Sequence, residues 1–466
     1  MPSADGPTAV CVDIGSTWTK ALHVDLTTGD LLGSASSPTT PAEVLQAYDA
    51  CRAHLVDQDP RAATARTLAC SSAGGGLRIA VVGNEELVTA EAGRRVALSS
   101  GGRVVAVVAM APDEASGDAG CDTHGALERT LGVTSPDVVL LTGGTDGGNS
   151  EVIVAAARAL TDAAVAGTWS GPVVVAGNVD AQPEVAEILA AAPAPLPYVL
   201  APNVLPRIGT LEPAGARAAV RRVFLEHVIG GKHLSARPDF LTMVRGATPD
   251  IVLTGVELLG DVLASEGGEP GTAVTGDVVV VDVGGATTDV HSVVRPDPER
   301  ADLGHEVVAV TGVTRTVEGD LGLRWSAPAT VEAAGLDGDP GLVDAARRRH
   351  DDPGWLPDTD AARDVDETIA RAAVGLALQR HAGRPGRGGV DLRGVGLVIG
   401  SGGLLRHGRP GVADRVLRWP RGTGRQLPEA PQVSVDGRYL LVAIGLLAEE
   451  HPDVARRLAR RLVPGR

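Results

Sequence analysis

The sequence is poor in aromatic residues and in lysine. Phe, Trp and Tyr make up only 2% of the 466 residues, lysine occurs only at positions 20 and 232, and hydrophobic residues as a whole make up 44%. We therefore expect a large core of Val, Leu, Ile and Ala, divided between two domains or two lobes of one unit. The formal net charge of −16 argues against a nucleic-acid partner, because such a partner requires a basic face.

The chain also has few cysteines and no long apolar run. Cys11, Cys51, Cys70 and Cys121 form no CxxC pair, so we expect buried, reduced thiols and no structural zinc site. No stretch reaches the roughly 18 uninterrupted apolar residues of a membrane span, and the first ten residues lack the basic and apolar regions of a secretory signal. We therefore expect a cytoplasmic protein with no membrane partner.

The stretch that organises the chain reads DVVVVDVGGATTDVHSV and covers residues 277–293. Its four consecutive valines, 278–281, predict a strand buried on both faces. The two glycines at 284–285 would let an anion approach backbone N–H groups. Asp282 and Asp289 would tolerate a phosphate only if Mg²⁺ or a water lay between them. Two interpretations remain open here: a site for Mg²⁺ and a triphosphate, or an ordinary glycine hairpin with capping aspartates.

The same pattern occurs near the start of the chain, in AVCVDIGSTWTKALHVD, residues 9–25. When the two stretches are aligned, the matched pairs are Asp13 with Asp282, Gly15 with Gly284, Ser16 with Gly285 and Thr19 with Thr288. Such a repeat predicts two similar lobes, each of which presents a hairpin to a shared cleft. A third stretch, VGLVIGSGGLLRH at 395–407, predicts a strand, a glycine-rich turn and a helix whose N-terminus favours an anion.

In this order, two Asp-containing hairpins and a strand–GxGG–helix unit resemble the ATPases of the actin, Hsp70 and sugar-kinase superfamily. More narrowly, the chain is similar to the MutL family of methylaspartate (glutamate) mutase accessory proteins, which is unrelated to mismatch-repair MutL. The matching segments are VDIGSTWTKA, CSSAGGGLRIAVVG, LLTGGTDGGN, VDVGGATTDVHSV, TRTVEGDLGLRWS and VIGSGGLLRH. The resemblance implies an α/β fold of two RNase-H-like lobes (actin/Hsp70 ATPase fold) with a nucleotide cleft between them. Residues 1–265 would form the first lobe and residues 266–466 the second.

The site residues expected from these motifs would bind ATP or ADP through Mg²⁺. Hydrolysis would depend on positioning and electrostatics. The candidate catalytic residues are Asp282, Asp289 and Asp13, and the candidate metal ligands are Asp13 and Asp282. The candidate nucleotide-binding residues are Asp13, Gly15, Ser16, Thr17, Gly284, Gly285, Thr287, Thr288, Gly400, Ser401, Gly402 and Gly403. Lys20 either neutralises phosphate charge or is an exposed strand residue, and both remain open.

The resemblance implies an accessory factor that binds and hydrolyses ATP to reactivate an adenosylcobalamin-dependent mutase. Glutamate (methylaspartate) mutase is the expected partner, and the expected effect is exchange of damaged cobalamin. Changes between ATP and ADP would shift which conformation binds the mutase better. Two alternatives use the same scaffold: a small-molecule kinase of the sugar-kinase type, for which no acceptor pocket with a base is visible, and an actin-like scaffold or filament protein. A homodimer is compatible with each of them.

Two helices are expected to connect the lobes. One begins with Thr-Pro-Asp at 248–250, with the threonine as its N-cap and the aspartate at the positive end of the helix dipole. The other covers 439–450, is apolar nearly all round and contains Gly445, which would allow two backbones to pack closely. Asp436 is expected to cap this second helix.

Four further segments have less defined roles. LLTGGTDGGN, within 137–150, repeats the strand–glycine-loop shape and would be the first lobe's counterpart of the GxGG turn. The CSSAGGG turn at 70–76 either lines the cleft or joins two paired strands. In TRTVEGDLGLRWS, Glu318 and Asp320 either act near the nucleotide or partner, or Asp320 caps a helix. The arginine-rich run at 347–350 is expected to be a solvated helix end.

Overall fold

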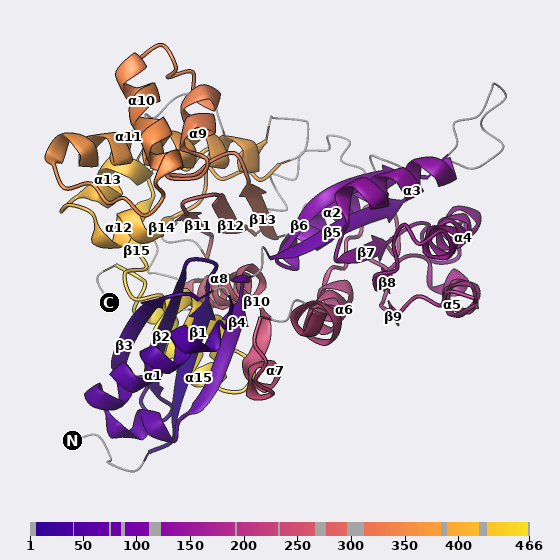
Figure 1. The fold of residues 1–466 in the computed structure, drawn as a ribbon, viewed down its shortest axis with the longest axis horizontal. Coiled ribbons are helices and arrows are strands. Elements are labelled where there is room, and N and C mark those ends of the chain that lie inside the picture. Colours follow the sequence, from indigo (N-terminus) through magenta and orange to yellow (C-terminus); the bar gives the residue numbers. More distant parts are fainter. Residues whose placement is uncertain are drawn as a thin grey trace.

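The computed structural model describes residues 6–40, 42–73, 76–84, 89–110, 123–191, 193–231, 234–265, 276–295, 312–383, 389–418 and 426–464. Its strands form three five-stranded sheets, which occupy three different regions of Figure 1. Two of the sheets have the same topology and form the two lobes. The third belongs to a domain inserted between two strands of the first lobe.

The first lobe has the strand order β10-β4-β1-β2-β3. Its central strand β1 pairs antiparallel with β2 and parallel with β4, β2 pairs antiparallel with β3, and β4 pairs parallel with β10. The strands are β1 Thr8–Ile14, β2 Trp18–Asp25, β3 Leu31–Pro38, β4 Arg66–Ser71 and β10 Val244–Ala247. Helix α1 (Leu45–Gln58), the short η1 (Pro60–Ala63) and α7 (Asp239–Met243) belong to the same lobe.

The second lobe repeats this arrangement in the order β13-β12-β11-β14-β15. Its central strand β11 pairs antiparallel with β12 and parallel with β14, β12 pairs antiparallel with β13, and β14 pairs parallel with β15. The strands are β11 Val278–Val283, β12 Thr288–Val293, β13 Val313–Glu318, β14 Leu397–Ser401 and β15 Gln432–Val435. Two sheets with this same mixed order confirm the predicted pair of RNase-H-like lobes.

The outer face of the second sheet is covered by helices of its own lobe. The valines of β11 alternate between the two faces of the sheet, and all four at 278–281 are fully buried, as predicted. Val279, Val281 and Val283 pack against α11 and α13. The helices are α9 Ala327–Ala333, α10 Pro340–Asp351, α11 Asp360–Ala382, α12 Gly403–His407 and α13 Val412–Leu417.

The inner faces of the two lobe sheets share one core, which contains three helices. These are α8 (Thr248–Ser265), α14 (Leu440–Leu447) and α15 (Pro452–Arg460). Their apolar side chains pack against Cys11 and Leu22 of the first sheet and against Val280 and Ile399 of the second. Helices α8 and α14 are the two predicted connecting helices, and α14 is buried along its whole length.

Helices α8 and α14 cross at two glycines. A Cβ added to Gly255 of α8 would clash with the carbonyl oxygen of Leu441, and one added to Gly445 of α14 would clash with that of Ile251. The predicted close packing at Gly445 is therefore confirmed. The predicted Asp436 cap is also confirmed, because its carboxylate accepts the N–H groups of Leu440 at 2.7 Å and of Leu441 at 3.0 Å.

The inserted domain, residues 77–230, has a parallel sheet in the order β6-β5-β7-β8-β9. Its strands are β5 Leu77–Gly83, β6 Gly102–Ala109, β7 Val138–Leu141, β8 Val173–Val175 and β9 Tyr198–Leu200. Its helices are α2 Thr89–Ser99, α3 Thr123–Thr134, α4 Glu151–Val165, η4 Val179–Ala181, α5 Gln182–Ala190, α6 Ala214–Val223 and the π-helical turn η5 Phe224–Ile229. It extends to the right of the lobes in Figure 1.

This domain corrects one sequence prediction. The strand–glycine-loop at 137–150 is β7 and the loop after it, and it belongs to the inserted sheet. The first lobe's equivalent of β14 is β4, because each pairs parallel with the central strand of its lobe. The turn after β4 begins with Ser72 and Ala73; Gly74 and Gly75 of the CSSAGGG motif lie outside the described residues, and its last residue, Gly76, has φ +72°.

Contacts add to one further expectation and correct another. Thr248 is the first residue of α8 and its hydroxyl donates to Asp13 at 2.8 Å, a partner that the sequence did not predict, while its role as an N-cap stays a prediction. The run at 347–350 is not wholly solvated, because Arg349 is only 2% exposed and its Nε donates to Asp366 at 2.5 Å. As expected, Cys11, Cys51 and Cys70 are free and buried. Among the described helices, none combines the length and the apolar character that a membrane crossing requires.

The helix crossing generates a stability prediction. Gly445→Ala should lower the free energy of unfolding by about 1–3 kcal/mol, the usual cost of overpacking, because the added methyl group has no space beside Ile251. The matched control is Gly375→Ala in α11, where an added Cβ meets nothing within 4 Å and removal of a helical glycine should stabilise by roughly 0.5–1 kcal/mol. Thermal and denaturant unfolding of both variants would measure this. Equal stability of the two variants would contradict the close crossing.

Candidate functional site

Two equivalent hairpins define the candidate site. In the first, the Gly15 N–H donates to the Trp18 carbonyl oxygen at 3.2 Å, and in the second the Gly284 N–H donates to that of Thr287 at 2.9 Å. Gly15 is required by close approach, since an added Cβ would lie 2.6 Å from the Trp18 oxygen. The turns beyond these bonds are open, with Ser16, Thr17 and Ala286 exposed. Both turns can therefore offer backbone N–H groups to an anion.

Asp13 is the residue before the last in β1, and both of its carboxylate oxygens accept hydrogen bonds. Its Oδ2 accepts from Lys20 Nζ at 3.1 Å, and its Oδ1 accepts from Thr248 Oγ1 at 2.8 Å and from Cys70 Sγ at 3.8 Å. Thr248 is the first residue of α8, so this bond attaches the connecting helix to the hairpin. The Asp13 carboxylate is only 6% exposed and carries a paired cation, which fits a role in positioning more closely than one as a free base.

Asp282 is the equivalent residue of the second hairpin, and its environment differs. Burial raises the pKa of Asp282 to about 6, and nearby Asp289 and Asp13 add to this shift, while Lys20 and a hydrogen bond with Ser401 oppose it. The electrostatic influence of Asp13 and Lys20 means that the two hairpins lie close enough to interact. Unlike Asp13, Asp282 forms no ion pair among the described residues. A half-buried carboxylate without an ion-pair partner fits a cation ligand.

Asp289 lies directly opposite Asp282 in the β11–β12 ladder. Its Oδ1 accepts from Arg315 Nε at 2.9 Å and Nη2 at 2.5 Å, and its Oδ2 accepts from Thr287 Oγ1 at 3.3 Å. The guanidinium occupies Oδ1, so a role for Asp289 in orienting water depends on its Oδ2. Sequence analysis missed Arg315, which lies on the neighbouring strand β13.

The hydroxyl groups of the second hairpin divide into two kinds. Thr288 Oγ1 is fully buried and donates to the Leu321 carbonyl oxygen at 3.0 Å, so it does not face the cleft. Its equivalent Thr19 is also fully buried and shares a hydrogen bond with Thr39. Thr287 is half-buried and contacts Asp289. The structure therefore places Thr287, but not Thr288, where a bound anion could reach its hydroxyl.

The third loop follows β14 and packs against the second hairpin. Gly402 has φ +108°, and a Cβ there would clash with the Val283 carbonyl oxygen, so this glycine is required by backbone geometry. Gly403 has no positive φ, and a Cβ there would meet nothing within 4 Å. Gly400 and Ser401 lie at the end of β14, with Ser401 opposite Asp282 in the parallel ladder. The strand register therefore brings the third motif to the second hairpin.

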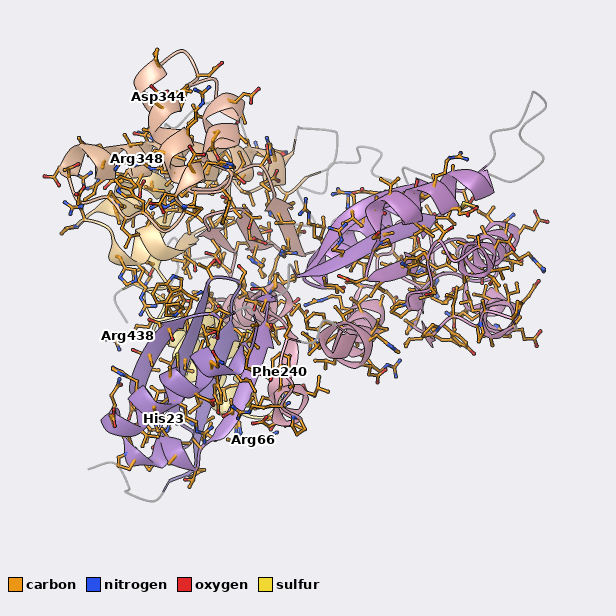
Figure 2. All side chains as sticks on the ribbon, viewed as in Figure 1. His23, Arg66, Phe240, Asp344, Arg348 and Arg438 are labelled. Carbon is orange, nitrogen blue, oxygen red and sulfur yellow. The ribbon has the colours of Figure 1, made fainter. Side chains whose placement is uncertain are left out.

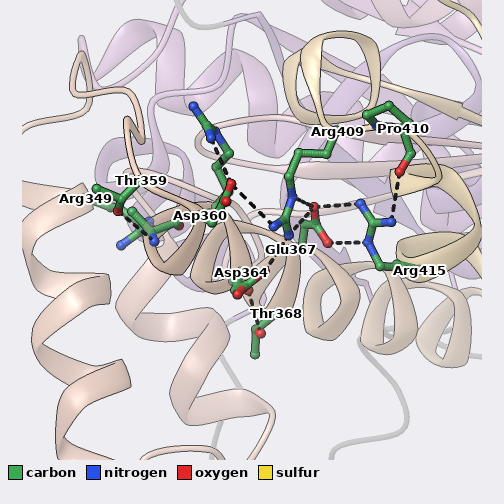
Figure 3. Close-up of polar contacts among 11 residues, drawn as sticks. Arg349, Thr359, Asp360, Asp364, Glu367, Thr368, Arg409, Pro410 and Arg415 are labelled. Atoms are coloured by element: carbon green, nitrogen blue, oxygen red, sulfur yellow. Dashed lines mark hydrogen bonds and ion pairs between the residues drawn. The ribbon is translucent and has the colours of Figure 1, made fainter.

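An ion-pair cluster fixes the segment that follows this loop (Figure 3). The Glu367 carboxylate on α11 accepts from Arg409 Nε at 3.0 Å and from Arg415 Nε at 2.6 Å. The Arg409 guanidinium also contacts Asp364 one turn earlier on α11. Because α12 lies between the loop and these arginines, the cluster holds α12 in place at the edge of the cleft.

The segment 319–326 is bound to the second hairpin by two backbone hydrogen bonds. The Leu323 N–H donates to the Gly284 carbonyl oxygen at 3.0 Å, and the Arg324 N–H donates to that of Gly285 at 2.8 Å. Of the two roles left open for Asp320, the helix cap is not found, because Asp320 pairs with Arg380 at 2.7 Å and Ser326 precedes α9 instead. Glu318 pairs with the same arginine at 2.6 Å.

Lys20, Arg406 and Tyr439 connect the two lobes beside Asp13. Lys20 Nζ lies 4.6 Å from the centroid of the Tyr439 ring, and the Arg406 guanidinium lies 4.1 Å from it. Burial lowers the pKa of Lys20, but Asp13, Tyr439 and Asp282 outweigh this effect and raise it overall. These residues line a pocket with Arg438, which Figure 2 labels at the junction of the lobes. Lys20 is therefore in the cleft and is not an exposed strand residue.

Sequence analysis could have found Lys20 from the repeat itself. The alignment that places Asp13 on Asp282 also places Lys20 on Asp289, a change of charge at matched positions. Tyr439 had no such signal, because its left-handed backbone, φ +57°, is rare for a bulky residue and does not follow from local sequence.

The residues present fit a magnesium ion bound together with phosphates. Among the described residues, no group of three or more His, Cys, Asp or Glu side chains converges on a metal position. Mg²⁺ in nucleotide sites needs fewer protein ligands, since one or two carboxylates, waters and phosphate oxygens complete its shell. Asp282 is suited to this role because its charge lacks an ion-pair partner within the described cleft. Asp13 would contribute through water, because Lys20 already pairs with it.

The raised pKa of Asp282 generates a pH prediction. Its carboxyl must lose a proton to bind Mg²⁺, so the affinity for Mg-ADP should be constant above pH 7 and fall by about tenfold per unit below pH 6. Calorimetry between pH 5 and 8 in buffers of different ionisation enthalpy would detect the released proton. Asp282→Asn should bind more weakly and remove this pH dependence.

The melting temperature of Asp282→Asn shows whether the variant is folded. In the ligand-free protein the raised pKa of Asp282 reduces stability above pH 6, where the carboxyl is ionised in both the folded and the unfolded state. This penalty disappears as the pH falls toward 4. Asp282→Asn should therefore melt no lower than the wild type at pH 7.5. An unchanged pH dependence of binding in the variant would assign the proton to another group.

Comparisons with known proteins place the chain in a family. The family described as MutL protein matches residues 9–463. "Protein MutL" of Clostridium tetanomorphum is 32% identical over 474 residues, which cover 97% of this chain and 98% of the relative. Among solved structures, nucleotide-free acetone carboxylase has a TM-score of 0.38 at 14% identity, covering 94% of this chain and 70% of that one. The ethanolamine utilization protein EutJ of Carboxydothermus hydrogenoformans has a TM-score of 0.30 at 10% identity, covering 96% and 91%. The match of the family and of its curated member along nearly the whole length shows that this chain belongs to the MutL protein family.

Proposed function

We propose that this chain is an accessory factor that binds and hydrolyses ATP in order to reactivate an adenosylcobalamin-dependent mutase. The proposed partner is glutamate (methylaspartate) mutase, and the proposed effect is exchange of damaged cobalamin. The observation that carries the proposal is that Lys20 of the first hairpin, 13–20, and Arg406 after the third loop share the Tyr439 ring, close enough to the second hairpin, 282–289, to act on Asp282, in a chain of the MutL family.

In this proposal, each part of the cleft has a separate task. The exposed turns at 15–17 and 284–286 bind phosphates through backbone N–H groups. Lys20 and Arg406 lie beside Asp13 and balance the negative charge of the nucleotide. Mg²⁺, when bound, neutralises phosphate charge. Asp282, which is mostly ionised at neutral pH, holds it and orders the water around it.

Coupling to a partner requires that the mutase bind one nucleotide state better than the other. A ligand shifts an equilibrium only by its differential affinity for the two conformations. The lobes are connected through α8 and α14, so a nucleotide that draws the hairpins together would change the angle between the lobes. A mutase bound across the lobes would then be gripped or released with the nucleotide state.

Gly403→Val tests whether nucleotide occupies the third loop. The backbone of Gly403 is ordinary and its surroundings are open, so the fold should remain intact. The branched side chain should fill the space of the nucleotide and lower ATP and ADP affinity together by about tenfold or more, or 1.4 kcal/mol. Gly338→Val, at another open glycine in the α9–α10 loop, should leave both affinities unchanged. Equal affinity of the two variants would exclude this loop from the site.

Reactivation itself is tested with a mutase that has been inactivated by turnover and retains its damaged cobalamin. The protein, Mg-ATP and free adenosylcobalamin should restore mutase activity, and omission of any one should prevent this. Asp282→Asn should reduce ATP hydrolysis by roughly 10²-fold and slow reactivation in parallel.

Two other outcomes of this experiment would overturn the proposal. Phosphorylation of a small metabolite without binding to any cobamide-dependent mutase would identify a kinase. Nucleotide-dependent polymerisation without an effect on a mutase would identify a scaffold.

A further inference from the structure

The two hairpins balance their charges in different ways. In the first, Asp13 faces a cation on its own partner strand, Lys20, at 3.1 Å. In the second, Asp282 faces another carboxylate, Asp289. The second hairpin therefore takes its cation from outside the repeat, from Arg315 on β13, whose side chain is only 4% exposed.

Arg315 also contacts residues outside the second hairpin. Its Nε and Nη2 donate to Asp289 Oδ1, and its Nη1 donates to the carbonyl oxygen of Leu98 at 3.1 Å and to that of Gly102 at 3.0 Å. Those two carbonyls belong to the inserted domain, at the end of α2 and the start of β6. A planar guanidinium with five N–H donors can make this set of bonds at once, whereas an ammonium cannot reproduce its geometry.

The same turn of the inserted domain also contacts the first lobe. We call residues 98–102 the α2–β6 corner. Gly101 in this corner has φ +78°, and a Cβ there would lie 2.7 Å from the N atom of Asp250 in α8. The Asp250 carboxylate is 1% exposed and accepts from Arg221 Nε of α6 at 2.5 Å. The inserted domain is thus bound to α8 near its N-terminus, where Thr248 holds Asp13.

The α2–β6 corner therefore contacts both β13 of the second lobe and α8, and Figure 1 shows β6 beside β13. On one side, one buried arginine connects it to Asp289. On the other side, packing at Gly101 and the Asp250–Arg221 ion pair connect it to the helix that holds Asp13. Neither the lobe sequence repeat nor the shared lobe topology requires such a contact.

We propose that Arg315 is a positioning residue that couples Asp289 to the α2–β6 corner, so that nucleotide binding in the cleft is transmitted to the inserted domain. This inference rests on the proposed nucleotide-binding function. A buried guanidinium cannot leave its carboxylate without an uncompensated charge. Asp289, Arg315 and the two carbonyls therefore move together. Because α8 holds the corner from the other side, a change in the separation of the hairpins alters the corner.

The test compares two arginines with the same chemistry. Arg349 is 2% exposed, and its guanidinium donates to the Asp366 carboxylate and to the carbonyl oxygens of Ala345 and Ala362. All of these partners lie within the second lobe, so Arg349→Lys is a matched control for Arg315→Lys. Hydrogen exchange of backbone amides in 89–109 is measured with and without Mg-ADP, and ADP affinity is measured by calorimetry.

In the wild type and in Arg349→Lys, Mg-ADP should change exchange in the α2–β6 corner by about threefold or more, as expected when local opening is altered. Arg315→Lys should keep its ADP affinity within about fivefold, less than 1 kcal/mol, and lose this response. If Arg315→Lys does not fold, Asp289→Asn removes the charge from the other end of the link and should also abolish the response.

The outcomes separate this inference from the function on which it rests. Failure of the wild type to bind ADP would overturn the proposed function and the inference together. ADP binding without a response in the corner would overturn the inference alone. An equal response in wild type and in a folded Arg315→Lys, or a loss of response in Arg349→Lys as well, would show that Arg315 is merely structural.

Discussion

The arrangement of both lobes depends on the crossing of α8 and α14, where neither helix has room for a side chain. Gly255 faces the Leu441 carbonyl and Gly445 faces that of Ile251. Each helix also begins beside a hairpin of the cleft. Helix α8 begins at Thr248, which holds Asp13, and α14 begins after Asp436 and Tyr439, the latter in contact with Lys20. Both helix starts contact the first hairpin, so the crossing sets where the two connecting helices meet Asp13 and Lys20.

The charge of the cleft follows from this arrangement, and it is unequal on the two sides. The first hairpin neutralises Asp13 with its own Lys20. The second places two carboxylates opposite each other and raises the pKa of Asp282, through burial first and Asp289 among the smaller causes, to about 6. The two hairpins have the same strand pairing but different charges. One of them can therefore orient the bound groups while the other holds a cation. In the MutL family member described here, the difference is a single exchange at matched positions, Lys20 and Asp289.

The inserted domain makes this protein more than a pair of lobes. It occupies the connection between β4 and β10, and its corner at 98–102 contacts both the start of α8 and Arg315 of β13. A corner that contacts α8, which holds Asp13, and Arg315, which holds Asp289, is well placed to respond to the separation of the hairpins. The low content of aromatic residues does not deprive the lobes of a common core, because the core that they share is formed mainly by Val, Leu, Ile and Ala.

Much of the fold and of the candidate site could be predicted from the amino-acid sequence, because the signals are local. Each hairpin places its aspartate, glycine turn and second strand within about a dozen residues, and strand alternation, turn chemistry and glycine content act over that range. The repeat of this unit predicted two lobes of the same topology, and the apolar helix with Gly445 predicted the close crossing. The residue types at the cleft, from Asp13 to Gly403, could therefore be predicted from the sequence.

Only the tertiary structure decided which of these groups are free to act. The hydroxyl of Thr248 bonds Asp13 across 235 positions of the chain, and Arg315 reaches the Leu98 carbonyl across 217. No local pattern specifies such partners. The loops at 137–150 and 395–407 look alike because a strand, a glycine turn and a helix have the same local physics wherever they occur. Their assignment to different sheets depends on strand pairing, which is set by contacts far apart in the sequence.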